Sequence, residues 1–382
     1  MDNPDLYAYF KAHLDDLTSL LANLIAVESP TTDKEAVDRF GAVIAEHFRG
    51  LQADLIIHPR QAVGNIVEAR WHADQPGRTL LFICHMDTVH PLGALAHNPI
   101  REEDGKLYGP GAYDMKGSIA ALLIALHALR DLNRFPRRPI TALMTTDEET
   151  GSDHSRMLIE ERAQSAALAM IMEPALPDGS LKTWRKSTGQ FTIRTYGVAA
   201  HAGGAHEAGV NAIEEMAHQI IALQRMTNYD LGTTVSVGVV QGGTRSNVIP
   251  DRCEALVDTR AMTIAEMERL TRQIKGLQPV LPGARVEVEG GFERPPMERN
   301  ALMIQTFEQA KDIAARYGLT LHESGSGGGS DGNYTAALGI PTLDGLGPAG
   351  DGAHSEREHV IISSLAASAT LIAALLLEWP DG

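Results

Sequence analysis

Two adjacent glutamates, Glu148 and Glu149, follow the apolar run of residues 139–144. Neighbouring side chains at the end of a strand point to opposite sides. One glutamate can therefore bind a metal ion while the other faces a water molecule beside it. The other candidate ligands also end apolar runs or lie in tight loops: His85 with Asp87, Asp114, Glu173 and His354. Two histidines and three carboxylates in such places indicate a hydrolase with two metal ions.

The segments that must position these side chains alternate between strand and helix patterns. The runs TLLFIC (79–84), ITALMTT (140–146) and ALAMIM (167–172) are continuously apolar, as in parallel strands buried on both faces. Residues 117–132 carry apolar side chains at helical spacing, and Ser118 is a candidate cap. We expect an α/β domain with a mostly parallel sheet and helices on both faces. Ligands of such sheets bind beyond the carboxyl ends of the strands, where the candidate residues fall.

The pattern changes after Lys186. Alternating strands and amphipathic helices follow in the order β-α-β-β-α-β, which predicts an inserted ferredoxin-like α+β domain. After residue 295 the helix-and-strand pattern returns, with a helix expected over 302–317 and an extended segment over 318–324. The predicted domains are a catalytic domain in two parts, 1–185 and 296–382, and an inserted lid or dimerisation domain, 186–295.

The segment from Gly325 to Gly332 (GSGGGSDG) has the composition of a flexible linker. However, it lies between a predicted strand and a short helix. A glycine-rich turn in that position can present backbone N–H groups to an anion.

Two metal ions held about 3.5–4 Å apart need a bridging carboxylate. Asp114 suits this role because it lies in an irregular turn before a helix. We assign His85 with Glu173 to one ion and His354 with Glu149 to the other. Imidazole and carboxylate ligands favour two Zn²⁺ per chain, with Co²⁺ or Mn²⁺ as substitutes.

Two acidic residues would act beside the ligands. Asp87, two residues after His85, would receive the second ring N–H of that histidine, or else serve as a loop cap. Glu148 would remain unligated as the general base, or else form a surface salt bridge. His201, between small residues at the end of a strand, is a further candidate. The remaining histidines considered have no such context and are expected to be structural or exposed: His90, His97, His127, His206, His218, His322 and His359.

The bulk properties limit the functional class. The formal net charge of −16 argues against nucleic acids and anionic membranes as partners. The acidic N-terminal residues lack an apolar signal segment, and no stretch of about 18 apolar residues is evident, so the cytoplasm is the expected location. The two cysteines, Cys84 and Cys253, do not require an oxidising compartment.

Nine motifs resemble, in order and spacing, those of the di-zinc exopeptidase and deacylase family that includes glutamate carboxypeptidase, acetylornithine deacetylase, succinyl-diaminopimelate desuccinylase and aminoacylase. They are ICHMDTV, GPGAYDMKGS, TTDEETGS, IMEP, AHAGG, RSNVIP, DTR, GGGSD and GAHSE. GGGSD and SNVIP look closest to the bacterial glutamate carboxypeptidase. Ala200 and Ser330 depart from the usual family pattern near the substrate.

The resemblance implies roles for residues that spacing alone does not assign. His85, Asp114, Glu149, Glu173 and His354 match the metal ligands, and two further sets match catalytic and substrate-binding positions. The catalytic set is Glu148 as acid/base, Asp87 behind the first histidine and His201 as the lid residue that stabilises the oxyanion. The substrate-binding set is Asn247, Arg260 and Gly328 for the substrate carboxylate, with Lys182 near its side chain. The resemblance also implies a homodimer formed through the inserted domain.

The expected reaction is hydrolysis of an amide bond in a small peptide or N-acyl amino acid, releasing an amino acid with a free carboxylate. A carboxypeptidase is preferred, with glutamate as the candidate product. An N-acyl-amino-acid deacylase would use the same machinery. Two further hypotheses are a metal-binding protein without catalysis and a carboxypeptidase with one metal ion, for which Asp114 would be dispensable.

Overall fold

The computed structural model describes residues 6–381, which form two compact units. The first unit comprises the chain up to Thr183, then Arg299–Gly325, and the chain from Ser330 onward. The second comprises Trp184–Glu298 together with Ser326–Gly329. Each unit has a hydrophobic core of its own.

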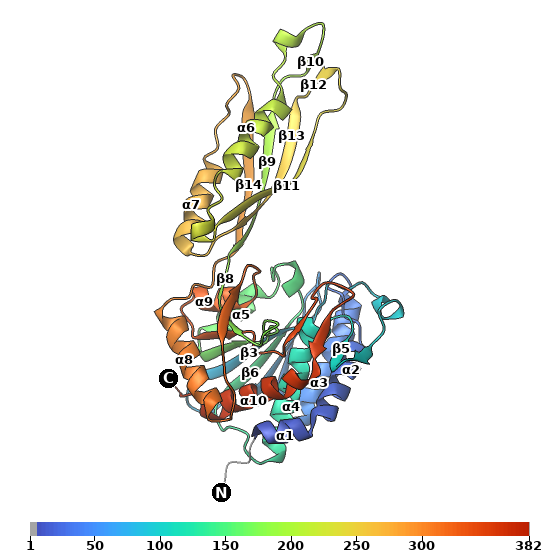
Figure 1. Ribbon diagram of the computed structural model, residues 1–382, viewed down its shortest axis with the longest axis vertical. Coiled ribbons are helices and arrows are strands. Elements are labelled where there is room, and N and C mark those ends of the chain that lie inside the picture. The colour runs from blue at the N-terminus through green and yellow to red at the C-terminus, as the bar shows by residue number, and fades with distance from the viewer. Residues whose placement is uncertain (1–5, 382) are drawn as a thin grey trace. The chain divides into compact units, whose positions relative to one another are not determined.

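The main sheet of the first unit has parallel strands at its centre (Figure 1). Its order is β1-β2-β6-β3-β7-β16-β8-β15, in which β6, β3, β7 and β16 run parallel. The pairs β1 with β2, β2 with β6 and β16 with β8 are antiparallel. The bounds are β1 Asp54–His58, β2 Ile66–Trp71, β3 Thr79–His85, β6 Ile140–Thr145, β7 Ala166–Ile171, β8 Leu181–Arg185, β15 Glu323–Ser326 and β16 Thr342–Asp344.

Both faces of this sheet are covered. Along β3, Phe82 and Cys84 belong to a large apolar cluster with α1, α2, α3, α4, α8 and α10, whereas Leu81 and Ile83 belong to a smaller cluster with α5 and α9. Burial on both faces explains why the central strands are continuously apolar. The helices are α1 Leu6–Ala12, α2 Leu14–Ile25, α3 Lys34–Gly50, α4 Gly117–Asp131, α5 Arg156–Ala163, α8 Ala301–Ala315, α9 Gly332–Ala337 and α10 Ile362–Glu378, with short turns η1 Ala94–Ala96, η2 Ala112–Lys116 and η3 Glu148–Thr150.

The segment Ala112–Asp131 is long and apolar enough to cross a membrane by length and composition alone. The expectation that no such segment exists was therefore too strict. Of its apolar window, 83% is buried inside the unit, and α4 contributes Ile119, Leu122 and Leu126 to the large cluster. A core helix of a globular fold passes the same test, and this one is a core helix.

A smaller antiparallel sheet brings the C-terminal loops to the segment before α4. Its order is β17-β18-β5-β4, and His359 of β18 pairs with Tyr108 of β5. The bounds are β4 Arg101–Glu103, β5 Lys106–Tyr108, β17 Gly350–Asp351 and β18 His359–Ile361. The loop that carries His354 connects β17 to β18, so this sheet fixes both ends of that loop.

The second unit has the predicted order β-α-β-β-α-β, formed by β9, α6, β11, β13, α7 and β14. Its antiparallel sheet has the order β11-β13-β9-β14, and Phe191, Val257 and Leu270 lie in its core. The bounds are β9 Thr188–Tyr196, β10 Ala200–His201, η4 His206–Ala208, α6 Ala212–Gln224, η5 Tyr229–Leu231, β11 Thr234–Gly242, β12 Val248–Ile249, β13 Arg252–Arg260, α7 Ile264–Lys275 and β14 Arg285–Arg294. The predicted fold class is confirmed, with antiparallel strands flanking the parallel centre.

Three local predictions were wrong. Ser118 does not cap α4: it lies inside the first turn, and its buried hydroxyl has no hydrogen-bond partner among the described residues. Glu148 and Glu149 lie in the 3₁₀ turn η3 and not at a strand end, since β6 stops at Thr145. Residues 318–322 are not in a strand, because β15 begins only at Glu323.

Candidate metal centre

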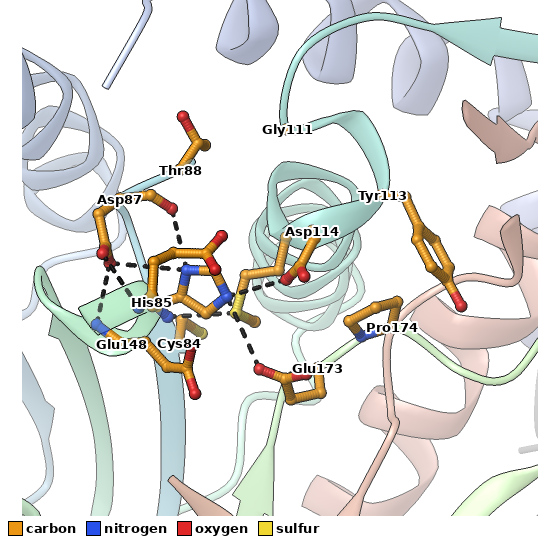
Figure 2. Close-up of polar contacts among 12 residues, drawn as sticks. Cys84, His85, Asp87, Thr88, Gly111, Tyr113, Asp114, Glu148, Glu173 and Pro174 are labelled. Carbon is orange, nitrogen blue, oxygen red and sulfur yellow. Dashed lines mark hydrogen bonds and ion pairs between the residues drawn. The ribbon is translucent and has the colours of Figure 1, made fainter. Parts of the chain in front are cut away.

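Three parallel strands deliver candidate ligands to one edge of the sheet. His85 is the last residue of β3 and pairs with Thr145 at the end of β6. Glu148 follows β6 in η3, and Glu173 follows β7 by two residues. Because β3 pairs in parallel with both β6 and β7, their carboxyl ends meet at one edge. Side chains far apart in sequence therefore converge here (Figure 2).

Asp114 lies between the two histidines. Its Oδ1 is 3.0 Å from His85 Nε2, and its Oδ2 is 3.5 Å from His354 Nε2. His85 Nε2 is 3.6 Å from Glu173 Oε1, and His354 Nε2 is 3.2 Å from Glu149 Oε2. The two oxygens of Asp114 thus face two separate groups, one with His85 and Glu173 and one with His354 and Glu149. Figure 2 shows the His85 side of this arrangement.

Asp87 is fully buried and organises the His85 side. Its backbone carbonyl lies 2.9 Å from His85 Nδ1, whereas its carboxylate oxygen lies 3.6 Å away, so the closer partner of the ring is the carbonyl. The carboxylate accepts hydrogen bonds from the backbone N–H groups of Glu148 and Glu149 at 3.4 and 3.3 Å and from the hydroxyl of Thr31 at 2.8 Å. Asp87 thereby fixes the turn that carries both glutamates.

The His354 side is more open. The side chain of His354 is 53% exposed, whereas that of His85 is 1% exposed. His354 lies in a loop with a backbone φ of 63°, a left-handed conformation that is uncommon for residues other than glycine. The two halves of the cluster are chemically alike but differ in access to solvent.

Mutual electrostatics are strong in this cluster. Hydrogen bonds to Asp114 and Glu149 raise the pKa of His354 to about 10. Burial by itself lowers the pKa of His85, but Asp114 and Asp87 outweigh it and hold that pKa well above its usual value. Burial raises the pKa of Glu149. Burial acts in the same direction on Asp114, yet its two histidine partners outweigh burial and hold its pKa well below the usual range. The cluster therefore contains more negative than positive charge, which favours the binding of cations.

The donor set fits divalent cations. Two groups offer ligand atoms that all lie within 4.8 Å of one another: His85 with Glu148 and Glu173, and His85 with Asp114 and Glu149. The buried Oε1 of Glu149 has no hydrogen-bond partner among the described residues, as expected of an atom whose partner would be a metal ion. Imidazole nitrogen with carboxylate oxygen is a donor set used by zinc. Distance alone allows Glu148 to act as a ligand as well as a base.

The ammonium group of Lys182 is hydrogen-bonded to a backbone carbonyl near this cluster. Its ammonium donates a hydrogen bond to the carbonyl of Pro174 at 2.8 Å and lies 3.9 Å from Glu173 Oε2. The side chain is 7% exposed. Lys182 thus supplies positive charge beside Glu173.

Comparisons with known proteins identify the family of this chain. Residues 81–378 match the model of peptidase family M20/M25/M40. The chain is 30% identical to carboxypeptidase G2 of Pseudomonas sp. (strain RS-16), covering 98% of this chain and 92% of that protein. The chain belongs to this peptidase family. It is therefore a hydrolase related to metallopeptidases, and the family resemblance carried by the motifs is confirmed.

A further relative and a solved structure extend the comparison. The uncharacterized protein YqjE of Bacillus subtilis (strain 168) is 28% identical over 78% of this chain and 81% of its own length. The structure of aminopeptidase PepT from Bacillus cereus superposes with a TM-score of 0.78 at 24% identity, covering 95% of this chain and 98% of that chain. At this identity the structural match supports the fold alone.

The other family positions lie in the second unit. His201 is exposed, and its Nδ1 accepts hydrogen bonds from the N–H groups of Gly203 and Gly204 at 3.1 and 2.9 Å. A neutral ring with an accepting Nδ1 carries its proton on Nε2, which leaves Nε2–H as a donor. Asn247 is exposed, and its carbonyl accepts the N–H of Ala202.

Arg260 and the glycine-rich segment form hydrogen bonds with other groups of the protein. The Arg260 guanidinium forms two hydrogen bonds, at 3.0 and 2.8 Å, with the carboxylate of Asp258. The carbonyl of Gly328 accepts a hydrogen bond from Arg185 at 3.3 Å. Three N–H groups of the segment, those of Gly328, Ser330 and Gly332, donate to neighbouring side chains. The segment is an ordered strand-to-helix turn, but these three amides are not available to an anion.

Sequence reasoning missed several residues that support the centre. Glu358 is buried and bonds to the loop of Asp114, and His90, expected to be structural or exposed, bonds to Glu358. Thr31 holds Asp87. The only signal in the sequence was the position of Glu358 four residues after His354, which does not reveal its partner.

Proposed function

We propose that this protein is a metallocarboxypeptidase that uses two zinc ions to hydrolyse an amide bond and release an amino acid with a free α-carboxylate, glutamate being the preferred candidate. The observation that carries the proposal is the placement of Asp114, whose two oxygens face two separate histidine–carboxylate pairs. The similarity to carboxypeptidase G2 supports the carboxypeptidase assignment.

The proposed ligands are His85, Asp114 and Glu173 for one ion and His354, Asp114 and Glu149 for the other. When bound, the ions would polarise the scissile carbonyl and activate a water molecule. The excess of carboxylates over cationic side chains supports this assignment, as does Oε1 of Glu149, which has no hydrogen-bond partner in residues 6–381. Cobalt or manganese would be the substitutes.

Glu148 is the proposed general base and acid. Its carboxylate comes within 4.8 Å of ligand atoms of His85 and Glu173, so it would lie beside a water molecule held by the bound ions. It would take a proton from that water and later deliver the proton to the leaving amine. Because its backbone N–H is held by Asp87, its position is set by a residue that is itself buried.

Two residues of the second unit have proposed roles that follow the family resemblance. The Nε2–H group of His201 suits a hydrogen bond to an oxyanion, since Nδ1 already accepts two amides. The guanidinium of Arg260 suits a substrate carboxylate, which would compete with Asp258 for the same donors. Lid and substrate-binding functions of this unit are part of the proposal, as are the contributions of Asn247 and Gly328.

A homodimer through the second unit is also proposed. Strand β11 lies at the edge of its sheet, and Val239 and Val240 on it are 44% and 53% exposed. An unpaired edge with exposed apolar side chains is suited to pairing with a second copy. Light scattering at several protein concentrations tests this assembly.

The test of the proposed activity is a hydrolysis screen with the zinc-loaded protein across peptides and N-acyl amino acids. We expect release of C-terminal amino acids, and Glu148→Gln should lower turnover by about 10²–10⁴-fold while keeping its metal. Glu46→Gln, an exposed glutamate in α3, is the matched control and should behave as wild type. A fully loaded wild type that cleaves no member of the panel would contradict the proposal, as would an active Glu148→Gln.

A further inference from the structure

Glu358 lies buried against the loop that carries Asp114. It is 1% exposed. Its Oε1 accepts hydrogen bonds from the backbone N–H groups of Tyr113 and Asp114 at 3.0 and 2.9 Å, and its Oε2 accepts one from Gly111 at 3.1 Å. The ring of His90 also contacts Oε2. One carboxylate thus accepts hydrogen bonds from three backbone amides of a single turn, including that of Asp114 itself.

The shape of this turn brings the amides together. Gly111 has a φ of 70°, and a Cβ atom at that position would lie 2.6 Å from the side chain of Thr88, so a side chain does not fit there. The chain then enters η2, and the amides of Gly111, Tyr113 and Asp114 converge on Glu358. Figure 2 shows the same turn directing the Asp114 carboxylate toward His85. Without an acceptor, these buried N–H groups would have no partner.

Glu358 also belongs to the segment that carries His354. Its N–H donates to the carbonyl of Ser355 at 3.1 Å, and its own carbonyl accepts the N–H of Gly109 at 3.3 Å. The same residue therefore bonds to the His354 loop through its main chain and to the Asp114 turn through its side chain. Asp114 and Glu358 are 244 positions apart in sequence, and no other described side chain accepts the N–H of Asp114.

We propose that Glu358 is a positioning residue for the metal centre, which locks the Asp114 turn and the His354 loop together so that two ions can share Asp114. This inference rests on the proposed two-metal function. Glu358 acts through the backbone of Asp114 and takes no part as a ligand. Its contribution should therefore fall mainly on the His354 side, whose loop is otherwise the more exposed.

The test is metal binding by Glu358→Gln, measured by zinc competition with a chromophoric chelator and by the visible absorption of the cobalt-loaded protein. Whichever way the new amide group turns, its –NH₂ faces at least one backbone N–H, so the turn must shift. We expect one ion to bind about 10–100-fold more weakly than in wild type, with an altered cobalt spectrum. Glu68→Gln is the matched control: it removes a buried carboxylate of the same unit that bonds to Arg70, Arg162 and His58. It should keep wild-type metal affinity and spectrum.

Wild-type affinity for both ions and an unchanged spectrum in Glu358→Gln would overturn the inference. An equal loss in Glu68→Gln would also overturn it, since the effect would then follow stability alone. Should Glu358→Gln not fold, Glu358→Asp keeps the charge and undergoes the same measurements, with a smaller loss expected and wild-type behaviour again contradicting the role. Failure of the wild type to bind two ions would instead refute the proposed function.

Discussion

Two buried carboxylate clusters of the first unit have opposite charge balances. Glu68 is fully buried, and its two oxygens are bonded by Arg70, Arg162 and His58. Around Asp114, by contrast, carboxylates outnumber the cationic side chains. Four carboxylates face two histidines and one lysine: Asp114, Glu148, Glu149 and Glu173 against His85, His354 and Lys182.

This difference distinguishes a cluster whose charge is already balanced from one whose composition suits cation binding. At Glu68 the protein supplies more positive charge than the carboxylate needs, so the cluster is complete in itself. At Asp114 the protein supplies too little, and the raised pKa of His354, about 10, reflects that shortage. Buried carboxylates in excess are expected to take up cations from solution.

Removing the charge of Asp114 should have the largest effect. Asp114→Asn takes away the oxygen pair that faces both histidines, so we expect loss of both ions. Activity should then fall on the order of 10³-fold, because several kcal/mol of transition-state stabilisation go with the metals. Metal content by mass spectrometry, together with turnover, checks this expectation.

Glu68→Gln is the control for Asp114→Asn, since it removes a carboxylate that is even more buried: the side chain of Glu68 is 0% exposed and that of Asp114 is 16% exposed. It should retain both ions and near wild-type turnover. If Asp114→Asn keeps two ions, the claim that the Asp114 cluster binds metal whereas the Glu68 cluster does not would be contradicted.

The two sides of the metal centre should respond differently to loss of their histidine. His354→Ala affects the exposed side, and we expect one ion to be lost while the ion at His85 stays bound. His85→Ala affects the buried side, where the ring also contacts Asp114 and Glu173, and should abolish binding of both. Titration of the wild type with a chelator should accordingly show two phases. A single phase, or equal losses in the two variants, would mean that the sides are equivalent.

The smallest effect is expected on stability alone. Burial opposes ionisation of Glu68, but hydrogen bonds from Arg162, Arg70 and His58 lower its pKa from 4.5 to about 2. The folded state therefore holds fewer protons than the unfolded chain between these pH values. The stabilisation is fully present above about pH 4.5 and declines as the pH falls toward 2.

Glu68→Gln should thus reduce the free energy of unfolding by about 2–3 kcal/mol at pH 7, with the difference shrinking below pH 4.5. Urea unfolding of both proteins over a pH series measures it. A difference that persists unchanged at pH 3 would show that packing, and not the charge of Glu68, is responsible.

Much of the fold was predictable because its signals are local. The central strands β3, β6 and β7 are apolar on both faces, and the helices of the second unit show clear amphipathic spacing. The positions of β1 and β2 were not predicted, since β1 is partly exposed and the apolar residues of the buried strand β2 are interrupted by Glu68 and Arg70. Ser118 was assigned as a cap because its type fits one, but the helix begins earlier, at Gly117, in continuation of η2.

The site was predictable to the extent that its residues follow strands or lie in recognisable motifs. The convergence of His85, Glu148 and Glu173 follows from parallel pairing of their strands. The contacts of Glu358 with the Asp114 turn were not predictable, because the turn lies 244 to 247 positions away and is bound through backbone amides, which leave no trace in residue type. The same holds for Thr31 behind Asp87.

The most direct test is anomalous X-ray diffraction from crystals of the zinc-loaded protein at the zinc edge. Two peaks per chain should appear, one bonded to His85, Glu173 and Asp114 and the other to His354, Glu149 and Asp114, with the carboxylate of Glu148 adjacent and bonded to neither. A single peak, or two peaks that do not share Asp114, would contradict the two-metal account, and Glu148 bound directly to zinc would refute its role as the base.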